Sequence, residues 1–262
     1  MKGARAHRRI GTSLPRLVLG FLLSTGGFVR AESGSLPAEC RQIVAVITPA
    51  WEATAGSLWR LGREGTVWRI LSNPIPVTVG HRGLGVGLGL HPAGLAGPAK
   101  EEGDRRAPAG VFLIESAFGT KAIKRSALPY RRTTDGDFWV DDPASSHYNQ
   151  WVSLTEPGVR QDWKSAEILR RKDGLYDLAL VIGHNRSPIV KGRGSAIFIH
   201  RWVAPGRSTI GCTAMDPKEL RELFDWLDAA SRPVIVQAPR ESLPQWGLPH
   251  DLRTLLESLA NP

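Results

Sequence analysis

Residues 194–224 read GSAIFIHRWVAPGRSTIGCTAMDPKELRELF, and the predicted fold rests on this stretch. Its apolar start predicts a buried strand that ends at His200. A loop then leads to Cys212, which lies just before a predicted helix. Asp216 is a typical N-cap, and Pro217 suits the first helical position. Apolar residues at helical spacing complete the pattern: Leu220, Leu223, Phe224 and Leu227.

The same stretch places a thiol and an imidazole where they can act together. A cysteine attacks a carbonyl carbon as the thiolate, which requires a base and hydrogen-bond donors for the oxyanion. We therefore predict Cys212 as the nucleophile and His200 as its base, with backbone amides of the turn as the oxyanion donors. The helix N-terminus after Asp216 is expected to lower the thiol pKa.

A metal site is the alternative reading of a Cys and a His twelve residues apart. Zinc sites usually bring paired ligands at short spacing, and the sequence has neither C-x-x-C nor H-E-x-x-H. We predict no metal and no cofactor.

Outside this stretch, short apolar runs alternate with Gly, Pro and Asn, a pattern typical of strands joined by turns. Strands are predicted at residues 43–47, 57–61, 66–71, 76–79, 111–115, 175–185 and 234–237, with a C-terminal helix at 250–259. Residues 80–110 are rich in Gly and Pro and are predicted to form a long loop. Residues 121–164 are predicted to be irregular and to cover a functional site. The predicted fold is mainly β with few helices.

The N-terminal segment, residues 1–31, has the features of a secretory signal peptide. It holds six Lys and Arg residues and no acid, followed by an apolar run that is too short to span a bilayer. We expect cleavage after Ala31 and export to the periplasm or cell wall. Without this segment the formal charge falls from +9 to +3, so a nucleic-acid partner is not expected.

The chain has two cysteines, Cys40 and Cys212. In an oxidising compartment they can form a disulfide, which is the alternative to a reactive thiol at Cys212. The glycine before Cys212 favours an accessible loop and a reactive thiol.

These motifs resemble the L,D-transpeptidases of the YkuD type. That family combines a strand ending in His with a later Ser/Thr-His-Gly-Cys motif, and here IFIHRW and TIGCTAM stand at these places. The segment KEEGDRRAPAGVF, residues 100–112, resembles the family's Gly-Asp-x-x-Thr-Pro-x-Gly-x-Phe segment. Two positions depart from the pattern: Ile210 replaces the motif His, and Ala214 replaces an Arg or Asn.

The resemblance covers residues 77–237 most clearly and implies a single catalytic domain over residues 32–262. It implies a β-sandwich or barrel with few helices, one of them following the cysteine loop. It also implies that the Cys212 thiol attacks the tetrapeptide stems of peptidoglycan, forms a thioester and passes the acyl group to an amine. Two alternatives stay open: a carboxypeptidase or endopeptidase that uses water, and a non-catalytic wall-binding protein.

Further residues around this motif are candidates for oxyanion or substrate binding. Thr209 and Gly211 match the motif, and Ser208 precedes it. His184 and Asn185 end the preceding predicted strand, and they lie near His200 if the two strands pair. A structural hydrogen bond at a strand end is the alternative role for His184.

A second polar cluster lies in the irregular region, within DDPASSHYNQW at residues 141–151. Asp142, Tyr148 and Asn149 are candidates for lid contacts to a peptide stem. Asx turns are the alternative, since Asp and Asn are ordinary turn residues.

Overall fold

The computed structural model describes residues 36–260 of the chain. The strands are β1 Gln42–Thr48, β2 Ala55–Glu64, β3 Val67–Ile70, β4 Ile75–Thr78, β5 Leu84–Val86, β6 Ala107–Gly119, β7 Tyr130–Arg132, β8 Asp137–Val140, β9 Trp151–Ser153, β10 Ala166–Ile168, β11 Leu178–Ile182, β12 Phe198–Arg201, β13 Thr213–Met215 and β14 Val234–Pro239. The helices are α1 Pro217–Trp226 and α2 His250–Ala260, with short 3-10 helices at Ala229–Ser231 and Arg240–Gln245. The predicted signal peptide at residues 1–31 lies outside the described residues.

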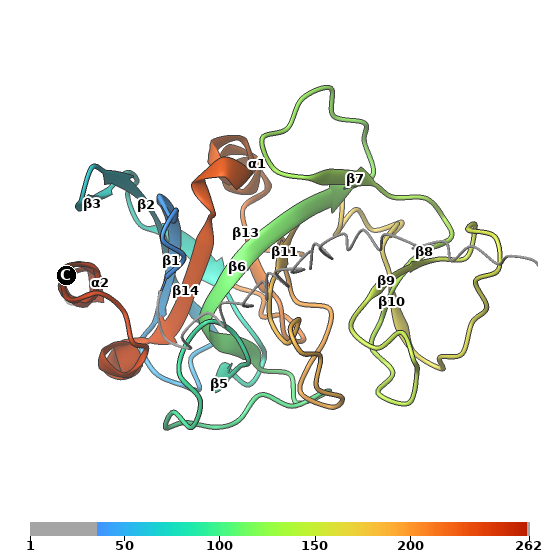
Figure 1. Ribbon diagram of the computed structural model, residues 1–262, viewed down its shortest axis with the longest axis horizontal. Coiled ribbons are helices and arrows are strands. Elements are labelled where there is room, and N and C mark those ends of the chain that lie inside the picture. Colours follow the sequence, from blue (N-terminus) through green and yellow to red (C-terminus); the bar gives the residue numbers. More distant parts are fainter. Residues whose placement is uncertain (1–35, 261–262) are drawn as a thin grey trace, which may run out of the picture. The chain divides into compact units, whose positions relative to one another are not determined.

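Eight strands close into a barrel (Figure 1). Their order around the ring is β1, β14, β6, β11, β12, β13, β4 and β2, and β2 pairs back with β1. The β1–β14 and β12–β13 pairs are parallel, and the other pairs of the ring are antiparallel. The structure confirms the mainly β fold with few helices.

The interior of the barrel is the main hydrophobic core. Every residue of β14 is buried, and so is β1 after its first residue. These strands are covered on both faces, because Trp246, Leu252 and Leu256 from the C-terminal segment join the same core cluster. This explains why both strands are mostly apolar and do not alternate with polar residues; the exception inside β14 is the buried Gln237.

A second, three-stranded sheet begins in the region that we predicted to be irregular: β8 and β9 lie within residues 121–164, and β10 follows directly after it. Its order is β10, β8, β9, with antiparallel pairing throughout. A separate apolar cluster joins this sheet to the barrel: Phe118, Trp139, Leu169, Tyr176, Ala179, Val181, Ala196, Phe198 and Cys212. The prediction was wrong here because each of these strands has only three or four residues, too few to show an alternating pattern.

The predicted long loop at residues 80–110 is also more ordered than expected. β5 pairs in parallel with β6, and β6 already begins at Ala107. A Cβ at Gly87 would come within 2.9 Å of Phe112, and one at Gly89 within 2.3 Å of the Val111 carbonyl oxygen. The glycines therefore allow close packing of this segment against the barrel.

Both predicted helices are present. Asp216 caps α1 as expected, since its carboxylate accepts a hydrogen bond of 2.8 Å from the Lys218 amide. α1 packs its apolar face inward through Leu220, Leu223 and Phe224. None of the helices in the described part of the chain is long and apolar enough to cross a membrane.

Candidate active site

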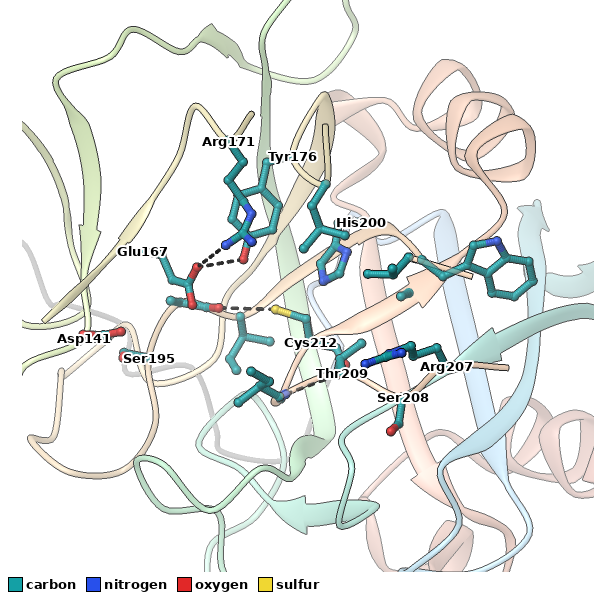
Figure 2. Close-up of a pocket in the computed structure, with 18 of the residues that line it drawn as sticks. Asp141, Glu167, Arg171, Tyr176, Ser195, His200, Arg207, Ser208, Thr209 and Cys212 are labelled. Carbon is teal, nitrogen blue, oxygen red and sulfur yellow. Dashed lines mark hydrogen bonds and ion pairs between the residues drawn. The ribbon is translucent and has the colours of Figure 1, made fainter. Parts of the chain in front are cut away.

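The parallel pair β12–β13 brings the predicted nucleophile and base into one cavity. His200 lies on β12, opposite Ala214 of β13, and Cys212 directly precedes β13. Both residues line a cavity of about 440 Å³ (Figure 2). The structure thus brings together the two residues that the sequence assigned to the chemistry.

The turn before Cys212 is held by Thr209. Its hydroxyl accepts a hydrogen bond from the Gly211 amide at 3.1 Å and donates one of 2.6 Å to the Cys212 carbonyl oxygen. Gly211 has φ +154°, a conformation that residues with a side chain rarely adopt. The Gly211 amide is therefore engaged inside the turn, and Thr209 shapes the backbone on which Cys212 sits.

The Cys212 thiol is buried in the second apolar cluster. Its sulfur accepts a hydrogen bond of 3.3 Å from the Phe198 amide and lies 3.5 Å from the Ala196 carbonyl oxygen. Burial raises the pKa of the Cys212 thiol to about 12, and the nearby negative charge of Glu167 acts in the same direction. The Phe198 amide and Lys100 favour the thiolate but do not offset the burial.

This overturns the expectation that the helix N-terminus lowers the thiol pKa. β13 and the cap Asp216 separate Cys212 from α1, and the effect of a helix dipole falls off within about one turn. Burial therefore has the larger effect on this thiol.

His200 is buried, with its ring in edge contact with Tyr176 at a centroid distance of 5.4 Å. Its Nδ1 lies 2.7 Å from the Arg201 carbonyl oxygen. A carbonyl oxygen only accepts, so Nδ1 carries the hydrogen and Nε2 keeps the lone pair that a base requires. Burial lowers the pKa of His200 to about 4. Near neutral pH the resting pair is thus a neutral thiol and a neutral imidazole.

The cavity also contains charged and polar residues besides Cys212 and His200. In Figure 2, Glu167 and Asp141 lie on one side of Cys212, and Arg207 and Ser208 lie on the other. Tyr176, Arg171 and Ser195 also line the cavity. Ser208, predicted from the sequence, thus does line the cavity. The sequence analysis missed four of these residues, which belong to no motif and lie up to 45 positions from Cys212: Glu167, Arg171, Tyr176 and Ser195. Only the packing of the small sheet against the barrel reveals them.

His184 and Asn185 are not among the residues that line this cavity. Strand β11 does pair with β12 as expected, but His184 is fully buried and bonded to the backbone. Its Nδ1 accepts from the Leu88 amide at 3.2 Å, and its Nε2 lies 2.8 Å from the Arg193 carbonyl oxygen. Asn185 bonds to the backbone of its own loop. The structure thus gives both residues structural contacts.

The three candidates for lid contacts also hold the fold together. Asp142 accepts backbone hydrogen bonds from Ala144 and Lys164, as in an Asx turn. Tyr148 is buried, and its hydroxyl donates to Glu102 at 2.5 Å. Asn149 is buried and hydrogen-bonds to four groups: the Trp139 indole, the Ala196 amide and the carbonyl oxygens of His184 and Asn185.

Other possibilities left open by the sequence can be compared with the structure. Cys40 and Cys212 are both free and buried, so the alternative disulfide is not formed. The described residues contain no group of three or more His, Cys, Asp or Glu side chains that is placed to hold a metal ion.

His200 on β12 and Cys212, directly before the adjacent strand β13, share one cavity, and a cysteine nucleophile and its base require such proximity. The family model described as "YkuD: L,D-transpeptidase catalytic domain" matches residues 55–236, more than half of the chain. The protein belongs to this family, as the resemblance predicted.

A solved structure from Bdellovibrio bacteriovorus, that of Bd1075, is also similar, with 14% sequence identity and a TM-score of 0.38. The match covers 84% of this chain and 55% of that one. The search of curated proteins found no match.

The two departures from the family motif lie at the cavity. Ile210 lines its mouth and is 81% exposed, whereas Ala214 is fully buried opposite His200. At neither position does a polar side chain reach toward the thiol.

Proposed function

We propose that this protein is a peptidoglycan L,D-transpeptidase that acts through a thioester at Cys212 on tetrapeptide stems. The observation that carries the proposal is the shared cavity of Cys212 and His200, with the histidine already in the tautomer that leaves Nε2 free to accept a proton. Membership of the YkuD family supports peptidoglycan as the substrate.

The proposed first half-reaction starts from the neutral pair. His200 Nε2 takes the thiol proton as Sγ attacks the carbonyl carbon of the bond before the terminal D-residue. The carbon–nitrogen bond then breaks, and His200 returns the proton to the leaving amine. A stem shortened by one residue stays attached to Cys212 as a thioester.

Because both pKa values favour the neutral forms, the proton transfer accompanies the attack and does not precede it. A stable thiolate–imidazolium pair would require a lower thiol pKa and a higher imidazole pKa than this cavity provides. The resting enzyme is therefore expected to react slowly with general thiol reagents and faster with an acyl donor that fits the cavity.

Intact-protein mass spectrometry tests this function. After incubation with a disaccharide tetrapeptide, we expect an adduct whose mass equals the stem without its terminal D-residue. Cys212→Ser should abolish the adduct, and Cys40→Ala, which removes the other thiol, should keep it. No adduct on a folded wild-type protein would refute the proposed function. A carbapenem, whose strained lactam acylates thiols, provides a second acyl donor for the same measurement.

Water as the acceptor is the second candidate function. Resolution of the thioester by water yields a tripeptide stem, whereas an amine acceptor yields a cross-linked dimer or an exchanged stem. Chromatography of the muropeptides after incubation separates these products. The acidic side of the cavity favours the amine, because its protonated form carries a positive charge.

We also propose that the protein acts outside the cytoplasm, in the periplasm or cell wall, where peptidoglycan lies. The composition of residues 1–31 supports this proposal. The mass of the mature protein purified from the periplasmic fraction should correspond to cleavage after Ala31. A full-length protein that stays in the cytoplasmic fraction would contradict it.

A further inference from the structure

One side of the cavity that holds Cys212 is lined by carboxylates from three separate parts of the chain. Glu102 comes from the loop before β6, Asp141 directly follows β8, and Glu167 lies on β10. Figure 2 shows Glu167 and Asp141 on the same side of the thiol. The small sheet thus contributes negative charge to the wall that faces the nucleophile.

The cations near this wall are already paired. Lys100 Nζ lies 2.7 Å from an Asp104 carboxylate oxygen and is almost fully buried. Arg171 binds Asp173 at 2.6 Å and reaches Glu167 only at 3.7 Å. Arg171 offsets only part of the charge of Glu167, because it lies closer to Asp173. With three carboxylates beside these two paired cations, the wall retains negative charge toward the cavity.

Two carboxylate oxygens on this wall have no hydrogen-bond partner among the described residues. Both contacts of Glu167 go to Oε2, which accepts from the Tyr176 hydroxyl at 3.1 Å and lies near Arg171. Oε1 has none. Asp141 Oδ1 is also without a partner, but it is closed off from solvent, which leaves Glu167 as the carboxylate that can bind a ligand.

Electrostatic coupling connects this wall to the nucleophile. Burial raises the pKa of Glu167, and the negative charge of Asp141 raises it further. The charge of Glu167 in turn raises the pKa of the Cys212 thiol. A cation bound at Glu167 would offset this repulsion and favour the thiolate.

We propose that Glu167 binds the ammonium group of the amine acceptor and takes its proton as the amine attacks the Cys212 thioester. The inference rests on the proposed function and deepens it, because it assigns an amine, and not water, as the acceptor. Asp141 contributes through its charge, which acts on Glu167 from the same wall.

The step balances. The ammonium gives one proton to the Glu167 carboxylate, and the amine nitrogen forms a bond to the thioester carbonyl carbon. The carbon–sulfur bond breaks, and the second proton of the nitrogen passes to the sulfur, so that an amide, a free thiol and a protonated Glu167 result. Glu167 then releases its proton to solvent.

The variant Glu167→Gln tests the inference, because it removes the charge and keeps the shape. An amide oxygen still accepts the hydrogen bond from Tyr176, so the fold should be retained, and thermal unfolding checks this. The matched control is Glu156→Gln, an exposed residue of the segment between β9 and β10 that pairs with Arg131.

The first readout is the partition of the thioester. The donor is a disaccharide tetrapeptide, and the acceptor is Nα-acetyl-lysine, which carries one side-chain ammonium. We expect Glu167→Gln to lower the ratio of amide product to hydrolysed stem by about 10²- to 10⁴-fold, the range of a lost general base. Adduct formation at Cys212 should persist. An unchanged ratio in Glu167→Gln overturns the inference but leaves the proposed function standing.

The second readout needs no turnover. Cadaverine, a diamine, should speed the alkylation of Cys212 by iodoacetamide by about three- to tenfold at constant ionic strength, since thiol reactivity follows its thiolate fraction. Its uncharged analogue 1,5-pentanediol should not. In Glu167→Gln the basal rate should rise, and the response to cadaverine should disappear.

A cadaverine response that persists in Glu167→Gln, or that is absent in the wild type, overturns the assignment of the ammonium site to Glu167. If the wild type forms no thioester, the proposed function fails, and the alkylation readout alone then decides whether Glu167 binds a cation. The Glu156→Gln variant should match the wild type in both readouts.

Discussion

At the scale of single residues, burial dominates the chemistry of the candidate site. The backbone amide of Phe198 favours the thiolate, but it does not compensate for the apolar cluster around Cys212. The same burial keeps His200 neutral and ready to accept a proton. The pair is therefore set for reaction with a bound acyl donor, and small reagents in solution are expected to react slowly.

His200→Ala should slow acylation of Cys212 by about 10²- to 10⁴-fold, because the attacking thiol loses the group that accepts its proton. The rate of adduct formation with a disaccharide tetrapeptide measures this effect. Far-ultraviolet circular dichroism should show that the barrel persists. Acylation at the wild-type rate in a folded His200→Ala protein would remove His200 from the mechanism.

Thr209→Val should impair the turn that presents the nucleophile. The substitution keeps the shape of the side chain but removes the hydroxyl that joins the Gly211 amide to the Cys212 carbonyl oxygen. We expect a loss of about 1–3 kcal/mol in the free energy of unfolding, together with slower acylation.

Thr209→Ser is the matched control, since it retains the hydroxyl. Urea unfolding and the rate of adduct formation should place it close to the wild type. If Thr209→Val and Thr209→Ser behaved alike in both measurements, the hydroxyl would have no role in positioning Cys212.

At the scale of elements, the small sheet β8–β9–β10 determines what surrounds the thiol. Trp139 of β8 packs in the cluster that buries Cys212, and β10 carries Glu167. Asn149 links this sheet to the barrel, because it bonds to Trp139 on one side and to the ends of β11 and of the loop before β12 on the other.

Asn149→Ala should destabilise the protein by about 2–5 kcal/mol, because it leaves several buried polar groups without partners. It should also change the reactivity of Cys212, since the Ala196 amide beside the thiol loses its acceptor. Urea unfolding and the rate of iodoacetamide alkylation measure the two effects. Gln150→Ala, an exposed neighbour, provides the control, and equal stability of the two variants would contradict a linking role for Asn149.

The elements differ in how well the sequence predicts them. α1 was predictable because its cap, its proline and its apolar spacing all lie within twelve residues. The strand ending at His200 and the Cys212 turn were predictable for the same local reason. The small sheet was not, because its stability comes from contacts between Trp139, Phe118 and Phe198 that join distant parts of the chain.

At the scale of the whole molecule, closure of the barrel depends on the β1–β2 and β1–β14 pairs. β1 pairs with its neighbour in sequence on one side and with a strand almost 200 residues away on the other. Local sequence patterns predict each of these strands, but they do not predict that β1 pairs with β14. The electrostatic environment of the site likewise follows from tertiary packing, which is why the raised thiol pKa and the acidic wall were missed.

The buried histidines make the stability of the whole molecule depend on pH. Burial lowers the pKa of His184 to about 3 and that of His200 to about 4. Below a pH of about 6.5 the unfolded chain binds protons that the folded chain does not. Stability is therefore complete above this pH and falls as the pH decreases toward the folded pKa values.

We expect each of these two histidines to lower the free energy of unfolding by about 2 kcal/mol when the pH is changed from 7.5 to 5. Urea unfolding at the two pH values measures the loss. In His200→Gln this loss between pH 7.5 and pH 5 should be smaller by about 2 kcal/mol, because the glutamine amide does not titrate. The comparison holds whatever the stability of the variant at pH 7.5. Burial raises the pKa values of Glu167 and Asp141, so these two carboxyl groups make the folded protein more stable at lower pH. Both groups are present in the wild type and in His200→Gln, so their contributions cancel when the two proteins are compared. A loss in His200→Gln equal to that of the wild type would mean that His200 takes up its proton without unfolding the barrel.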